Sequence, residues 1–171
     1  MAEPLFFALW PDAKVRRALH QLRQGLPRHG GREPHVTDLP ITLAYLGRIS
    51  TGQRDCAEQI AGQVRTPPFC LQVDTLGFWR RSGILWCAPA QTPAPLAELV
   101  ARLSIGLAEC GIVLDRRPFR PHITLVRNAR HGTAGAWIEP FAWPVTELVL
   151  AAGRQGQRPR YEILARWPLE S

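Results

Sequence analysis

The chain of 171 residues contains no apolar run that could cross a bilayer, since a spanning helix takes about 20 consecutive apolar residues. Residues 1–4 lack the basic segment and the small-residue cleavage site of a secretion signal. These absences predict a cytoplasmic protein with no membrane partner. The chain also lacks a phosphate-binding P-loop, a dinucleotide glycine fingerprint and a Gly-x-Ser-x-Gly turn, so the nucleotide-binding and serine-hydrolase classes that depend on them have no support.

Cysteine is scarce, and its spacing carries no signature. The four cysteines are Cys56, Cys70, Cys87 and Cys110, and none belongs to a Cys-x-x-Cys pair. A zinc site or a redox dithiol therefore has no support. In a reducing cell such residues behave as small buried hydrophobes, and we expect this of all four. No motif calls for a metal or another cofactor.

Lysine is almost absent, because Lys14 is the only one, yet the net charge is +7. The positive charge is therefore carried by arginine, whose planar guanidinium suits phosphate. An excess of basic residues favours anionic partners, with nucleic acid first. A codon bias toward arginine explains the shortage of lysine equally well, but it leaves the positive field unchanged.

Hydrophobic residues make up 46% of the chain, and its length fits one domain or two small lobes that share a core. Apolar runs and helical spacing alternate along it, which is typical of an α+β fold with helices on the outer faces of antiparallel or mixed sheets. The expected strands are 5–10, 39–46, 69–76, 84–88, 121–127, 143–151 and 160–166, and the expected helices are 12–27, 51–64 and 94–110.

The stretch Pro-Phe-Arg-Pro-His-Ile-Thr-Leu-Val-Arg at 118–127 is the most informative. In a strand, His122 and Thr124 share one face while the residues between and after them face the core. The tripeptide Ile-Thr-Leu occurs at 123–125 and again at 41–43, an offset of 82 residues that is close to half the chain. This repeat predicts two pseudo-symmetric lobes within a single domain, residues 1–171, with a central cleft.

With both strands in view, the chain resembles the 2H phosphoesterase superfamily, and within it the bacterial RNA 2′,3′-cyclic phosphodiesterase group, also called 2′-5′ RNA ligases. The resemblance is carried by four ordered blocks, at 5–11, 38–47, 118–127 and 160–164. It implies a monomeric hydrolase that opens 2′,3′-cyclic phosphate ends of RNA, or cyclic nucleotides, to 2′-phosphates. RNA ligation through a 2′-5′ bond is a further activity of the group.

The resemblance fails at one point. The family is named for two His-x-Thr motifs, of which the second is intact at 122–124, whereas the first has Pro40 where the family has its histidine. Thr42 of the first motif is retained. His35 begins a literal His-x-Thr, but it lies five residues upstream of Pro40, an odd offset that reverses its face on a continuous strand. We therefore do not expect His35 to take over, although a loop histidine can swing toward a cleft.

The resemblance also assigns roles to further residues. His122 is the acid or base, and Thr42 and Thr124 bind phosphate oxygens. Arg127, five residues after His122, neutralises the phosphate, unless it is merely a surface arginine at a strand end. Phe7 in the first block offers its ring to a base, although a place in the core is the more ordinary role for an aromatic in an apolar strand.

Hydrolysis of a cyclic phosphodiester needs one group to take a proton from water and another to protonate the leaving ribose oxygen. Losing one of the two lowers the rate by about 10²–10⁴-fold, so Pro40 predicts impaired activity. Three alternatives remain open: a binder of RNA or nucleotides that does not cut, a member that acts on another small phosphodiester, and a substitution in an otherwise active enzyme. Since proline cannot donate to a strand ladder, Pro40 should stand where pairing begins or lapses.

Overall fold

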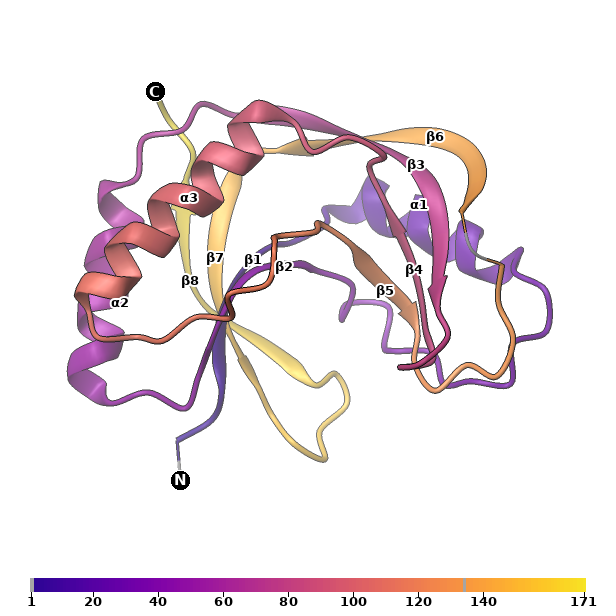
Figure 1. Ribbon diagram of the computed structural model, residues 1–171, viewed down its shortest axis with the longest axis horizontal. Helices are drawn as coiled ribbons and strands as arrows, with labels where there is room; N and C mark the ends of the chain where they lie inside the picture. Colours follow the sequence, from indigo (N-terminus) through magenta and orange to yellow (C-terminus); the bar gives the residue numbers. More distant parts are fainter. Residues whose placement is uncertain (1, 134) are drawn as a thin grey trace.

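One antiparallel sheet runs through the protein (Figure 1). The computed structural model describes residues 2–133 and 135–171. Its elements are β1 (Leu5–Leu9), α1 (Ala13–Gln24), β2 (Ile41–Gly47), α2 (Thr51–Gln63), β3 (Phe69–Trp79), β4 (Ile84–Ala88), α3 (Ala94–Glu109), β5 (Ile123–Val126), β6 (Ala136–Val145), β7 (Glu147–Gly153) and β8 (Tyr161–Pro168). The eight strands lie in the order β6-β3-β4-β5-β2-β1-β7-β8, and the named strands pair antiparallel throughout. The α+β prediction is confirmed, with an antiparallel sheet and not a mixed one.

The sheet repeats itself about the β2–β5 pair. On one side lie β2-β1-β7-β8 and on the other β5-β4-β3-β6, and β1-α1-β2 corresponds in the chain to β4-α3-β5. Each of the two repeated helices packs against the opposite half of the sheet, since α1 contacts β6 and α3 contacts β2. Figure 1 shows α2 and α3 together on one side of the molecule and α1 on the other. The equivalent strands β2 and β5 therefore meet at the centre.

Local chemistry explains where the helices begin. The Asp12 carboxylate accepts the Val15 N–H at 2.8 Å and caps α1, and Ser50 and Gln53 form a reciprocal capping box on α2. Arg23 of α1 is buried, and its guanidinium donates at 2.9 Å to the carbonyl of Pro34 in the loop before β2. The Arg23–Pro34 hydrogen bond holds α1 against the loop that leads into the first motif.

The predicted strand 143–151 is wrong as a single element. β6 ends at Val145, β7 begins at Glu147, and the two strands lie in opposite halves of the sheet. Pro144 cannot donate a ladder hydrogen bond, but β6 is an edge strand with one side unpaired, so the proline is tolerated there. The residues that follow the predicted strand 121–127 have no regular structure over 128–133, and Ala134 lies outside the described residues.

The expectation of four buried free thiols is also wrong. Cys56 of α2 and Cys110 after α3 form a disulfide, with Cα atoms 5.8 Å apart, while Cys70 is exposed. Only Cys87 behaves as predicted, and burial raises the pKa of its thiol far above the usual range. The pairing depends on α2 lying beside α3, a tertiary contact that cysteine spacing does not encode. Among the described residues, the helices fall short of the length and apolar character that a membrane span requires.

Candidate active site

The two motif strands meet at a single residue pair, Ile41 opposite Ile123. Both isoleucines are fully buried on the core side of the sheet. In an antiparallel register the flanking positions oppose each other crosswise, so residue 42 faces 122 and residue 40 faces 124. Because side chains alternate along a strand, these four point away from the core. A cavity of about 160 Å³ lies there, lined by Pro40, Thr42, His122 and Thr124 together with Asp38, Trp79, Ile84, Arg127 and Tyr161.

His122 is prepared to accept a proton. Its Nδ1 lies 2.8 Å from the carbonyl oxygen of Arg120, and since a carbonyl only accepts, Nδ1 carries the hydrogen and donates it. The neutral ring therefore keeps its lone pair on Nε2. Burial lowers the pKa of His122, and the positive charge of Arg127 lowers it further, while the hydrogen bond to Arg120 opposes them. A neutral imidazole with a free Nε2 is the form that a general base requires.

Aromatic rings stand on two sides of the cavity. Trp79, at the end of β3, packs edge-to-face on His122 with ring centroids 4.7 Å apart, and Tyr161 begins β8. Sequence reasoning did not single out either residue. Trp79 fell in a predicted turn because β3 runs three residues beyond the expected end, and Tyr161 belonged to a recognised block without an assigned role.

Asp38 joins the first motif to the last strand. Its buried carboxylate accepts the backbone N–H groups of Arg160 at 2.8 Å and Tyr161 at 3.2 Å. Hydrogen bonds to an ionised acceptor are stronger than neutral ones. They hold the start of β8, and with it Tyr161, against the residues that precede β2. Asp38 too was noted only as part of a matched block.

Pro40 stands directly before β2, outside the paired residues, as expected for a residue without an N–H. Its ring offers the cavity no proton donor or acceptor. His35 does not line this cavity. Its Nδ1 lies 2.8 Å from the Thr37 hydroxyl and accepts the Thr37 N–H at 3.2 Å, and it faces a neighbouring cavity of about 520 Å³.

The role predicted for Phe7 is wrong. Phe7 is fully buried among core residues, with its ring 5.9 Å from that of Trp167, so neither face is open to a base. The adjacent Phe6 lies on the other face of β1, where its ring packs 5.0 Å from Tyr161. Two consecutive aromatics necessarily point to opposite faces of a strand, and an all-apolar run does not tell which of them faces the core.

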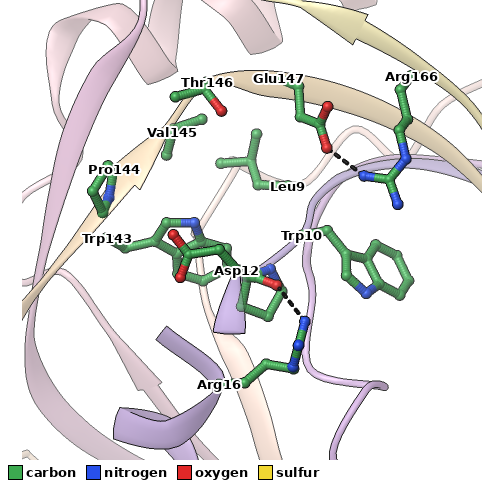
Figure 2. Close-up of a pocket in the computed structure, with 11 residues that line it drawn as sticks. Leu9, Trp10, Asp12, Arg16, Trp143, Pro144, Val145, Thr146, Glu147 and Arg166 are labelled. Carbon is green, nitrogen blue, oxygen red and sulfur yellow. Dashed lines mark hydrogen bonds and ion pairs between the residues drawn. The ribbon is translucent and has the colours of Figure 1, made fainter. Parts of the chain in front are cut away.

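A second cavity, of about 250 Å³, lies between the end of β1, the start of α1 and the β6–β7 connection (Figure 2). Its charged groups are already engaged with one another or with the backbone. Arg166 pairs with Glu147, Arg16 donates to the Pro11 carbonyl at 3.2 Å, and Asp12 caps α1. The described residues that line it include no histidine, so it lacks the acid–base equipment of the first cavity.

The described residues do not offer a cluster of side chains that could bind a metal ion. Within residues 2–133 and 135–171, no three His, Cys, Asp or Glu side chains lie close enough together to hold an ion. In the first cavity the only such groups are His122 and Asp38, and both oxygens of Asp38 accept backbone N–H groups. The arrangement supplies instead a base, hydroxyl donors and a guanidinium around one small space, which suits an anionic phosphate ester.

Comparison with known proteins places the chain in a family. Residues 10–157 match the 2′-5′ RNA ligase superfamily. The RNA 2′,3′-cyclic phosphodiesterase of Escherichia coli K12 is 37% identical over 177 residues, covering 99% of each chain. A protein of the same name from Geobacillus stearothermophilus is 33% identical, over 79% of this chain and 46% of that one. The structure of E. coli LigT with 3′-AMP superposes with a TM-score of 0.88 at 33% identity, covering 100% of both chains. The chain therefore belongs to the 2′-5′ RNA ligase superfamily.

Proposed function

We propose that this protein is an RNA 2′,3′-cyclic phosphodiesterase that hydrolyses cyclic phosphate ends to 2′-phosphates, at a rate held down by Pro40. The observation that carries the proposal is the Ile41–Ile123 register, because it sets His122 opposite Thr42 and Pro40 opposite Thr124 around one small cavity. The names of the relatives support the same reaction. A 2′-5′ ligation would open the same ring in the same cavity, with the 5′-hydroxyl of a second RNA end attacking phosphorus in place of water and the 3′-oxygen leaving.

His122 acts as the base in this proposal. Its free Nε2 takes a proton from the attacking water while its Nδ1–H stays bonded to Arg120. The hydroxyls of Thr42 and Thr124 donate to the non-bridging phosphate oxygens, and Arg127 neutralises the charge that develops on them. All four side chains line the cavity, so one phosphate can contact them together.

The reaction lacks its acid. The leaving ribose oxygen needs a proton, and the first motif, which would supply the second histidine, has Pro40 at that position of the cavity wall, with no proton to give. Asp38 does not replace it, since both of its oxygens are already engaged as acceptors of backbone N–H groups. Water must then protonate the leaving group, which slows the reaction by about 10²–10⁴-fold relative to a two-histidine site.

The test is hydrolysis of a nucleoside 2′,3′-cyclic phosphate by the natural chain and by His122→Ala, with the product isomer identified chromatographically. We expect slow formation of the 2′-phosphate by the natural chain and none above background by His122→Ala. Equal turnover by the two proteins would refute the role of His122, and release of a 3′-phosphate would refute the proposed direction of opening.

A second candidate function is binding of RNA ends without cleavage, and the observation that favours it is Pro40 in a chain of net charge +7. It would be supported if neither the natural chain nor Pro40→His turned over while both bound RNA ends. We further propose that the protein acts as a monomer, since one chain supplies both halves of the cavity, and, independently of that geometry, that it acts on RNA in the cytoplasm. Sedimentation at micromolar concentration and cell fractionation test these two points.

A further inference from the structure

The cavity of about 520 Å³ adjoins the proposed active site, because three residues form part of the wall of both. Asp38, Arg127 and Tyr161 line both cavities. The larger one lies between the loop before β2 and the loop from β7 to β8, and its remaining lining residues are Arg32, Glu33, Pro34, His35, Gln155, Gly156, Gln157, Arg158 and Arg160. We call it the arginine groove. A ligand held by its phosphate at His122 can extend into this groove past Tyr161.

Among the described residues, no carboxylate forms an ion pair with an arginine that lines the groove. In residues 2–133 and 135–171, the ion pairs involve neither Arg32, Arg127, Arg158 nor Arg160. The Glu33 carboxylate lies at ion-pair distance from two other side chains, 3.6 Å from Arg23 and 3.5 Å from His29. Asp38 is bonded to the backbone. Four arginines and two carboxylates line the groove, so its lining carries a net positive charge.

Two of these arginines are set side by side by the backbone. Arg32 and Arg127 form an isolated antiparallel bridge with reciprocal N–H···O bonds of 2.7 and 2.8 Å. Residues directly opposite each other in such a pair project to the same side, and like charges there repel. An anion beside the pair removes that repulsion. Because Arg127 lines both cavities, this bridge marks the point where a second phosphate would follow the first.

We propose that the arginine groove binds the phosphate on the 5′ side of the reacting nucleotide, so that the protein reads two consecutive phosphates of an RNA end. This rests on the proposed function, since it takes the first cavity as the seat of the cyclic phosphate. Tyr161 stands between the two sites with the Arg160 guanidinium 5.9 Å from its ring centroid, and it offers an aromatic face to the intervening nucleoside. Arg158 and Arg32, which are exposed and line only the groove, hold the second phosphate.

The experiment measures binding of reaction products, so that it does not depend on turnover. Adenosine 2′-monophosphate is compared by calorimetry with the dinucleotide ApA bearing a terminal 2′-phosphate and with adenosine 2′,5′-bisphosphate. We expect the dinucleotide to bind roughly tenfold tighter than the monophosphate at low salt, as for one added charge-assisted contact. The slope of log K against log salt should steepen by about 0.7. A gain that the bisphosphate shares shows that a free 5′-phosphate suffices, and a gain confined to the dinucleotide shows that the phosphodiester is read.

Matched variants locate the effect. Arg158→Gln and Arg32→Gln should remove most of the dinucleotide's advantage and leave monophosphate binding unchanged, whereas Arg17→Gln, an exposed arginine of α1 that lines none of the three cavities, should preserve it. Equal affinity for all three ligands, or an equal loss in Arg17→Gln, overturns the groove but leaves the hydrolysis proposal standing. Failure of the monophosphate to bind, with no hydrolysis by the natural chain, refutes the proposed function itself.

Discussion

Replacing Pro40 by histidine is the sharpest perturbation of the proposed active site. The register places residue 40 on the same face as His122 and opposite Thr124, at the edge of a cavity of about 160 Å³. A histidine there would bring a second titratable nitrogen to the cavity from the other motif strand. It would supply the acid that we infer to be absent, while His122 keeps its bond to Arg120 and remains the base.

The expected gain is large compared with the expected loss of stability. Restoring an acid–base partner raises kcat/KM by about 10²–10⁴-fold, equivalent to about 2.7–5.4 kcal/mol of transition-state stabilisation. Removing a proline frees the unfolded chain and lowers the free energy of unfolding by about 0.4–1 kcal/mol. Pro40 stands outside the paired residues, so no ladder bond is broken, and the variant should fold.

The assay is kcat/KM on a nucleoside 2′,3′-cyclic phosphate, with two controls. Pro40→Ala removes the proline without adding an acid and should stay as slow as the natural chain. The double variant Pro40→His/His122→Ala should lose the gain, because the acid works only with its base. An equal gain in Pro40→Ala, or a gain that survives the double substitution, would show that the new histidine does not act with His122 and would refute the two-histidine reasoning.

Three further predictions test the site and its supports. Because burial lowers the pKa of His122, kcat/KM of the natural chain should fall as the pH drops, with a midpoint below about 6.5; a midpoint above that value contradicts the tautomer and burial argument. Asp38→Ala removes the acceptor of two partly buried backbone N–H bonds and should lower the free energy of unfolding in urea by about 1.5–3 kcal/mol; an unchanged midpoint would show that Asp38 does not hold β8. Gly106→Ala should cost about 1–3 kcal/mol, since its Cβ would lie 2.5 Å from an α2 side chain, while Gly62→Ala, with its nearest atom at 3.7 Å, should be neutral or stabilising in the same melts.

Local pattern was enough to find most elements. The strand predicted at 84–88 is β4 with the same bounds, and helix 94–110 differs from α3 by one residue, because each has a clear apolar period and Gly or Pro at its ends. The junction at Thr146 was missed, since the apolar pattern continues from β6 into β7 and the change of partner strands lies in the tertiary pairing. The Cys56–Cys110 disulfide was missed for a similar reason, because its two cysteines are 54 positions apart in the sequence.

The proposed site was predictable where it follows the internal repeat and not elsewhere. The two Ile-Thr-Leu segments predicted that Thr42, His122 and Thr124 would gather, and they line one cavity. Trp79 and Tyr161 come from the ends of β3 and β8, and neither is adjacent to a motif strand in the sheet order. Trp79 and Tyr161 reach the cavity only because the sheet curves, and a short stretch of sequence does not predict that curvature.

Because one polypeptide encodes both half-sites separately, position 40 can change without any change at position 122. In a dimer of identical halves, a codon that removed one histidine would remove its counterpart as well, and the cavity would lose both titratable rings at once. Here the two halves are joined in a single continuous sheet, so a substitution at position 40 leaves His122 and Thr124 of the other strand in place. If the proposed function is right, one codon at position 40 would therefore set the rate of hydrolysis without removing the phosphate contacts of the other half.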